Sequence, residues 1–587
     1  MHLNKANPRE YLRQAIDTEI DLLESSIRES VLALRQRREA RNALAPISSL
    51  PTDVIEDIFS LLRVPGASPP CIPGEKPERL DSLAWLRVAH VCHQWREIAF
   101  NHLLFWSHVD FTTVSSAGAA EMLARAKKAP LHLEARIPDH WDNARFSAFE
   151  RELLPRLSHT RYLSISTKAV YLRRTIHGLA SPAPTLEYLS LSQPSVLWAR
   201  VIVPDTLFDN TTPSLSSLEI RNCDISWKSP LLKGLRNLEI RAAFENVRPC
   251  LTDWLDALGE MPRLKKLVLH SASPNAFPFP FDIERTITLP FLTHLDVSTS
   301  ADDCALALAH LVLPALACLC LTAEVYHRNG EDLKKILPYV ARHSHGPQDP
   351  RPLQSMLICG KTGSANILAW PVPVPDIDIQ SRSPVSWPAA TLSARVTLSI
   401  TAVGMFGPQI QHQILDVAMA ALPLDSLVTL TAQRFTEFDD QLWLRHAPRW
   451  PLLQRVRLAP LATHGFIEML LQDNGGRECP LLPSLTTLDL TGVALSARTT
   501  DSLCDALTKR GEQGVPLETL DLRTCHTTSH AVRLLGEIVV DVLAPAEIQD
   551  VATWGLFVPH DSEADYYSDG DDDDYDDQYI SGYGDSN

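Results

Sequence analysis

The sequence predicts an α/β fold, in which N-terminal helices precede a curved parallel sheet of repeated strands and a disordered acidic tail follows. Three observations carry this prediction. Apolar residues recur at helical spacing over 9–106, a Leu-x-x-Leu-x-Leu phrase recurs over 150–525, and residues from 561 onward have no apolar stripe. These patterns divide the chain into a long helix (1–45), a helical module (46–110), a connecting segment (111–150), a repeat region (151–545) and a tail (546–587).

The first element is a predicted helix over 9–41. Its apolar residues follow three- and four-residue steps, with Ser30 breaking one step: Ile16, Ile20, Leu23, Ile27 and Leu34. Such a stripe fits an amphipathic helix that packs back on the body, or a self-associating coiled coil. The stripe spans barely three heptads, which favours packing on the body.

Two further helices are predicted between residues 50 and 106. Pro51 suits a first helical position, where its missing N–H costs nothing. The first helix carries a wide apolar stripe: Val54, Ile55, Ile58, Phe59 and Leu62. The second carries another: Val88, Val91, Cys92, Trp95, Ile98 and Ala99. Between them, residues 64–82 contain five prolines, which predict an inserted surface loop.

This ordered set resembles an F-box. The resemblance rests on Leu50-Pro51, Ile58-Phe59, Val91-Cys92-x-x-Trp95-Arg96 and a closing Phe105-Trp106. It implies that the module docks on the adaptor subunit of a cullin-based, SCF-type ubiquitin ligase. Matching positions become candidate adaptor contacts: Leu50, Pro51, Ile55, Ile58, Phe59, Val91, Cys92 and Trp95. Trp95 fits equally well as a core residue that joins the two helices.

The middle of the chain repeats one phrase at intervals of about 20 to 32 residues. Clear copies end in these residues: Leu189-x-Leu191, Leu218-x-Ile220, Leu238-x-Ile240, Leu267-x-Leu269, Leu295-x-Val297, Leu319-x-Leu321, Val456-x-Leu458, Leu488-x-Leu490 and Leu520-x-Leu522. Looser copies fit 157–165, 353–358, 392–400 and 424–430. This period is typical of leucine-rich repeats, which stack into a solenoid with a concave sheet face. Over 319–424 we expect irregular repeats or an inserted loop at the Pro-rich 347–388.

A doubly wound α/β enzyme is the alternative fold, but short strands and only 23 glycines disfavour it. The combined architecture is similar to F-box proteins with leucine-rich-repeat-like regions, of the type expanded in mushroom-forming fungi. That resemblance implies a substrate receptor that itself forms and breaks no covalent bond. The alternative is a scaffold that binds the adaptor without causing degradation of any protein.

Strand parity indicates which side chains a protein substrate would meet, because residues between the leucines point away from the core. The outward positions are Glu219, Arg221, Glu239, Arg241, Lys266, Asp296, Arg457, Asp489, Asp521 and Arg523. Their mixed charges suggest a polar protein epitope.

Patterns that would indicate catalysis are weak. Cys359-Gly360-Lys361-Thr362 resembles the end of a phosphate-binding loop, but Ser355 stands where that loop needs glycine. His343 and His345 are expected in a solvated loop, and Cys318 and Cys320 on an outward strand face. We therefore expect no catalytic residue, metal or cofactor.

Composition and the N-terminus point to an intracellular protein. The net charge is −17, but 561–587 holds eleven acidic and no basic residues, so the rest of the chain carries an ordinary charge of about −6. No concentrated basic face is evident, so nucleic acid is not an expected partner. The apolar run 305–323 is interrupted by His310 and Pro314 and reads as a helix and a buried strand, not a membrane span. Eleven cysteines without a CxxC pair, behind an N-terminus that lacks a signal-peptide core, predict reduced thiols in the cytoplasm, the nucleus or both.

Overall fold

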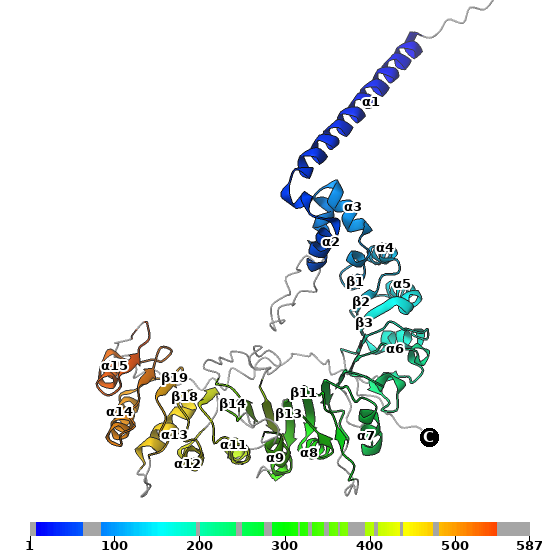
Figure 1. Ribbon diagram of the computed structural model, residues 1–587. Helices are drawn as coiled ribbons and strands as arrows, with labels where there is room; N and C mark the ends of the chain where they lie inside the picture. Colours follow the sequence, from blue (N-terminus) through cyan, green and yellow to red (C-terminus); the bar gives the residue numbers. More distant parts are fainter. Residues whose placement is uncertain are drawn as a thin grey trace, which may run out of the picture.

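The computed structural model describes residues 8–62, 84–194, 200–241, 249–274, 284–314, 317–326, 331–344, 352–361, 364–373, 394–403, 409–434, 438–472, 480–546 and 548 (Figure 1). The predicted insertion at 64–82 and nearly all of the predicted tail lie outside these residues. The fold is mixed α/β, with helices at the N-terminus and a large, mostly parallel, curved sheet behind them.

The N-terminal helix α1 (Pro8–Ala43) is a single helix that projects away from the sheet (Figure 1). Every residue from 11 to 41 is exposed, including Ile16, Ile20 and Leu23. The expectation that this helix packs back on the body is therefore wrong. A four-residue 3-10 turn at Pro46–Ser49 then leads into the helical module.

The module consists of α2 (Thr52–Leu61), a 3-10 segment (Ala84–His90), α3 (His93–Asn101) and a 3-10 turn (Leu103–Trp106). Pro51 occupies the N-cap of α2, one position before the predicted one. The second apolar stripe is split, because the chain leaves the 3-10 segment at Val91 and starts α3 after Cys92. The Cys92 sulfur accepts a hydrogen bond from the Trp95 backbone N–H at 3.4 Å, which caps α3.

Within the described residues one sheet has seventeen strands. In spatial order they are β1 (His108–Asp110), β2 (Leu131–Arg136), β3 (Thr160–Ser166), β4 (Tyr188–Ser192), β6 (Ser217–Arg221), β8 (Asn237–Arg241), β9 (Lys266–His270), β11 (His294–Ser300), β13 (Cys318–Val325), β16 (Val396–Ala402), β15 (Ser364–Trp370), β14 (Ser355–Lys361), β17 (Thr429–Arg434), β18 (Arg455–Leu458), β19 (Thr487–Leu490), β20 (Thr519–Asp521) and β21 (Asp541–Leu543). Two-stranded sheets pair β5 (Ile202–Val203) with β7 (Asp224–Ile225), and β10 (Ile287–Thr288) with β12 (Leu311–Val312).

The helices lie on the outer side of the curve and the strands on the inner side (Figure 1). The helices that follow the module are α4 (Ser116–Ala126), α5 (Asn143–Leu153), α6 (Ala169–Gly178), α7 (Leu251–Gly259), α8 (Ala301–Ala309), α9 (Glu331–Ser344), α11 (Gln409–Ala421), α12 (Asp440–His446), α13 (Pro460–Leu471), α14 (Ala497–Glu512) and α15 (Ser529–Gly536).

The recurring phrase produces the core. In β6 and β8 the side chains alternate between buried and partly exposed, so that Leu218, Ile220, Leu238 and Ile240 are buried between sheet and helices. Successive strands stack the same apolar positions, and the result is one continuous apolar cluster from Ile55 to Val539. No single strand buries its apolar side alone, so the units stabilise each other through stacking.

The sheet begins earlier than the predicted repeat region. Strand β1 lies at the end of the predicted module, and β2, α4 and most of α5 occupy the segment that we expected to be a connection. Strand β2 pairs in parallel with both β1 and β3. The sequence signal is weak there because β2 buries Leu131, Leu133 and Ala135 rather than the full leucine phrase.

The region 319–424 is irregular, as expected, but its form was not predicted. Strand β15 runs antiparallel to both β14 and β16, while β16 pairs in parallel with β13 and β14 with β17. The hairpin therefore inserts two strands and one reversal into a parallel series. Both faces of it are buried, and its second face forms a separate apolar cluster: Leu357, Cys359, Leu368, Trp370 and Ala394.

Gly360 and His343, from two of the weak catalytic patterns, both lie inside regular elements of the fold. Gly360 lies inside β14, where an added Cβ would collide with Ser364 and would sit 2.5 Å from the Gln411 amide nitrogen. Its smallness serves strand packing, and Cys359, Gly360 and Lys361 lie in an extended strand rather than in a phosphate-binding turn. His343 is not in a solvated loop: it is buried at the end of α9, with Nε2 2.8 Å from the Ala317 carbonyl oxygen. His345 lies outside the described residues.

The apolar run 305–323 forms the end of α8, strand β12 and the start of β13, as the sequence predicts. None of the helices in the described ranges has the length and apolar character that a bilayer crossing requires.

Candidate functional site

Helix α2 presents two different apolar faces. Ile55 and Phe59 retain only 1% of their exposure and form core, whereas Val54 (39%), Leu61 (71%) and Leu50 (37%) remain exposed. The exposed members, Leu50, Val54 and Leu61, are spaced by four and seven residues, which places them along one side of the helix and its N-terminal lead. A short helix with one buried and one exposed apolar face fits a docking element better than a simple core helix.

An aromatic cluster holds the buried face in place. The Phe59 ring packs edge-on against Trp95, with centroids 5.3 Å apart, and lies 5.9 Å from Phe105. Phe105 in turn packs edge-on against Trp85 at 4.6 Å and Trp106 at 5.6 Å. The partly buried Trp95 therefore joins α2 and α3 from inside, so its internal role is the one that the structure supports.

The eight predicted adaptor contacts thus separate into groups. Ile55 and Phe59 are buried in the chain's own core and are not available to a partner in this form, and Trp95 contributes to the same cluster. Val91 is 58% exposed in the break before α3, while Ile58 and Cys92 are partly exposed. Leu50 and Pro51 are exposed. Val54 and Leu61 are also exposed but were not among the predicted contacts, although Val54 belongs to the predicted stripe.

The module is joined to the sheet without a flexible boundary. The Trp106 indole N–H donates to the Ala99 carbonyl at 2.8 Å, and the Ser107 carbonyl accepts from the His132 N–H of β2 at 2.9 Å. The Arg125 guanidinium of α4 lies 4.8 Å above the Trp106 ring. Because module and sheet share one apolar core, a molecule bound to the module is held in a defined orientation relative to the sheet.

The inner face of β6, β8, β9 and β11 carries a network of charged side chains, which we call patch A. Glu239 is its centre: its carboxylate oxygens lie 3.0 Å from Arg221, 2.8 Å from Arg241 and 3.1 Å from Lys266. Glu219 pairs with Arg221 and accepts a hydrogen bond from the Tyr188 hydroxyl. At the other edge Asp296 meets His270 at 3.2 Å. All six predicted outward residues of these strands therefore belong to patch A.

We expect Glu239→Gln to destabilise the sheet by up to about 3 kcal/mol at pH 7. Burial alone would raise the pKa of Glu239, but hydrogen bonds and charge from Arg241 and Lys266 outweigh it and lower the pKa to about 2. A lowered folded-state pKa gives stability above about pH 4.5 that is lost as the pH falls towards 2. Urea unfolding at several pH values between 3 and 7 should show this loss for the wild type and a flatter profile for the variant. Parallel profiles would contradict it.

The remaining four outward residues form a second group, patch B. Arg457 Nε lies 2.6 Å from Asp489 on the neighbouring strand, and Arg523 binds Asp521 at 2.6 Å. Arg457, Asp489 and Asp521 share one register row across β18, β19 and β20. Five strands separate patch B from patch A: β13, β16, β15, β14 and β17. The predicted surface is therefore two patches on one curved sheet.

A row of stacked rings lies on the strands next to patch A, and it was not predicted from the sequence. The rings of His108, His132, Tyr162 and Tyr188 lie on β1 to β4, with successive centroids 4.0, 3.7 and 4.2 Å apart. Strand parity could have found Tyr188, since it directly precedes Leu189 of a clear phrase. Burial and the hydrogen bond to Glu219 raise the pKa of Tyr188, so it stays a neutral donor.

Two of these rings and a neighbouring carboxylate bring potential metal-ligand atoms within 4.8 Å of one another: His108, His132 and Glu134. The two imidazole planes differ by only 16°, so their nitrogen lone pairs run side by side instead of converging on one point. Glu134 Oε1 also lies 2.8 Å from His132 Nε2. This hydrogen bond lowers the pKa of the Glu134 carboxyl, although burial acts to raise it. This geometry favours a stacked ladder over a tetrahedral metal centre.

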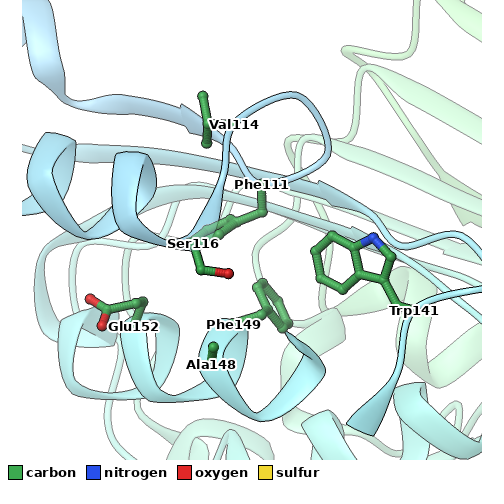
Figure 2. A pocket seen from close by; sticks show the side chains of 7 residues that line it. All are labelled: Phe111, Val114, Ser116, Trp141, Ala148, Phe149 and Glu152. Atoms are coloured by element: carbon green, nitrogen blue, oxygen red, sulfur yellow. The ribbon is translucent and has the colours of Figure 1, made fainter. Parts of the chain in front are cut away.

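Neither the two outward cysteines nor the hollow in Figure 2 indicates a reactive site. Burial raises the pKa of Cys318, and raises that of Cys320 to about 12, so both outward cysteines stay protonated. Figure 2 shows a hollow lined by residues of α4, α5 and adjoining loops, among them Phe111, Trp141 and Phe149. Its volume of 10 Å³ has room for about one water molecule.

Comparison with known proteins agrees with the module. A family model described as F-box-like matches residues 47–112, which contain α2, α3, the aromatic cluster and β1. No curated protein matches the chain. The F-box-like domain supports the resemblance drawn from the sequence. Such a domain suggests binding to the adaptor of an SCF-type cullin complex, in proteins that are typically substrate receptors rather than enzymes.

Proposed function

We propose that this chain is a substrate-receptor subunit of a cullin-RING, SCF-type ubiquitin ligase. The observation that carries the proposal is the F-box-like module whose α2 exposes Val54 and Leu61 while Ile55 and Phe59 form its core. The exposed face, together with Leu50, Pro51 and Val91, would dock on the ligase adaptor. Apolar side chains that stay exposed beside a well-packed core are the usual mark of a protein-binding surface.

The sheet supports the second half of the proposal. We propose that it is an irregular leucine-rich-repeat solenoid, whose inner face binds a protein substrate through patches A and B. Its support is the series of parallel strands with leucines buried and charged residues on the helix-free side. The internal ion pairs leave both charge signs at the surface, which suits a polar epitope of mixed charge.

In this proposal the chain accelerates ubiquitin transfer without forming or breaking a bond. Its contribution is effective concentration and orientation of the substrate near the ubiquitin-loaded enzyme. The shared core of module and sheet supports this role, since a rigid connection between the two binding surfaces preserves the orientation.

Co-purification with the adaptor tests the docking surface. We expect Val54→Asp/Leu61→Asp to reduce adaptor binding by about a hundredfold or more, because two charges would enter an apolar interface. The control Thr52→Asp/Gln94→Asp adds the same charge at exposed polar positions near the starts of α2 and α3. Its binding should stay within about threefold of wild type. Equal binding by the two double variants would refute the proposed docking face.

A non-degradative scaffold that binds the adaptor is the alternative function. The same pulldown, repeated with the proteasome inhibited, separates the two: a receptor retains ubiquitinated client proteins, and these disappear in the Val54→Asp/Leu61→Asp variant. Adaptor binding without ubiquitinated clients would favour the scaffold.

We further propose that the protein acts in the cytoplasm, the nucleus or both. Within the described residues, none of the nine cysteines takes part in a disulfide, the exposed Cys250 included, which suits a reducing compartment.

A further inference from the structure

Helix α1 carries an apolar stripe with no partner inside the described chain. Seven residues follow steps of four, four and three: Leu12, Ile16, Ile20, Leu23, Ile27, Val31 and Leu34. Each retains between 43% and 62% of its exposure. A strict heptad spacing would continue the stripe from Ile27 to position 30, which is the polar Ser30. The apolar Val31 stands one residue later, so the stripe is continuous.

This spacing is an 11-residue repeat, which corresponds to about 3.67 residues per turn. The stripe therefore stays on one side of a nearly straight helix for about 33 Å. A long helix in water draws most of its stability from burying such a face. Since α1 projects away from the sheet (Figure 1), the body does not cover it.

The charges beside the stripe identify the partner. Residues 17–24 contain four carboxylates, those of Asp17, Glu19, Asp21 and Glu24, and no basic residue. Residues 35–41 contain four arginines and one glutamate: Arg35, Arg37, Arg38, Glu39 and Arg41. A second copy aligned in parallel would place like charges side by side. An antiparallel copy places each acidic run towards the basic run of the other chain.

The apolar positions allow the same arrangement. They are distributed evenly about Ile27: Leu23 and Val31 lie four residues to either side, and Ile20 and Leu34 lie seven residues to either side. A two-fold axis near Ile27 would thus bring apolar residues opposite apolar residues over 20–34, as an isologous interface requires. The same axis sets Asp17 opposite Arg37 and Glu19 opposite Arg35 of the other copy.

We propose that α1 pairs with α1 of a second copy as an antiparallel two-helix dimer. The dimer would carry two helical modules, and the proposal does not depend on what those modules bind. A partner that presents two sites binds a clustered target more tightly than either site alone.

Sedimentation equilibrium of the full chain tests the proposal, and the expected mass is twice 65.3 kDa. Ile20→Asp/Ile27→Asp should weaken dimerisation by about a hundredfold, because charges would enter the apolar seam. The control Gln14→Asp/Ser25→Asp adds equal charge on the opposite side of α1 and should leave the dissociation constant within about threefold. Circular dichroism confirms that α1 stays helical in both. A monomeric wild type, or an unaffected Ile20→Asp/Ile27→Asp dimer, would overturn the proposal.

Charge reversal tests the direction of the helices. Arg35→Glu/Arg37→Glu/Arg38→Glu should weaken an antiparallel dimer by about tenfold or more, because acidic runs then face acidic runs. Adding Asp17→Lys/Glu19→Lys/Asp21→Lys to the same chain should restore association. A parallel dimer would respond little to either change, so an unchanged dissociation constant would refute the antiparallel arrangement.

Discussion

Phe59→Ala is expected to lower the stability of the helical module by about 3–5 kcal/mol. Phe59 is 1% exposed and contacts the rings of Trp95 and Phe105, so its removal leaves a cavity at the junction of α2, α3 and the following turn. Hydrogen exchange should show a loss of protection over 52–106 while the distant strands β18 to β20 stay protected.

Val54→Ala is the matched comparison, because Val54 lies on the same helix but is 39% exposed. Its effect on stability should be below about 1 kcal/mol. The two variants distinguish a residue that builds the module from one that a partner would touch. If Phe59→Ala left the exchange of 52–106 as slow as Val54→Ala does, the aromatic cluster would not be the core of the module.

Gly465→Ala is expected to destabilise the C-terminal part of the sheet by about 3 kcal/mol. Gly465 lies in α13, and an added Cβ would collide with the Phe438 carbonyl oxygen and sit 2.6 Å and 2.7 Å from the Asp439 backbone carbons. Asp439 is the N-cap of α12, whose side chain accepts a 2.8 Å hydrogen bond from the Leu442 N–H. The backbone of this cap cannot move aside without breaking it, so the helices must separate.

Gly511→Ala supplies the control. Gly511 lies in the last turn of α14 with no atom within 4 Å of its added Cβ, so the substitution should be neutral or stabilise the helix by up to about 1 kcal/mol. Urea unfolding of both variants measures the difference. Equal midpoints would mean that α12 and α13 can separate freely, which contradicts their close packing.

Much of the architecture was predictable because it repeats. Each clear leucine phrase lies on a strand, and parity correctly distinguished buried Leu218 and Ile220 from the outward Glu219 and Arg221. The period of two is a local property of extended chain, so no knowledge of the neighbours is needed to derive it. The ordered F-box-like set was equally local, and the family match over 47–112 supports it.

The same local reasoning could not order the strands. It missed β2 because three modest apolar residues do not make a phrase, and it missed the reversal of β15 because a hairpin of alternating apolar residues looks like any other strand. The β14–β15 hairpin supplies two of the five strands that separate patch A from patch B. Pairing between distant strands depends on which whole elements compete for the same sheet edge. A short stretch of sequence carries no information about that competition.

The sequence by itself determined the helical module, the repeating strands and the charges that lie between the leucines, because helical and strand periodicities are written residue by residue. Only the tertiary structure decided which side of each stripe is used. Ile55 and Phe59 became core and Val54 and Leu61 surface, and α1 kept its entire stripe exposed. Periodicity shows that a face is apolar. Whether that face is buried depends on which partner packs against it, and the partner lies elsewhere in the chain or outside it.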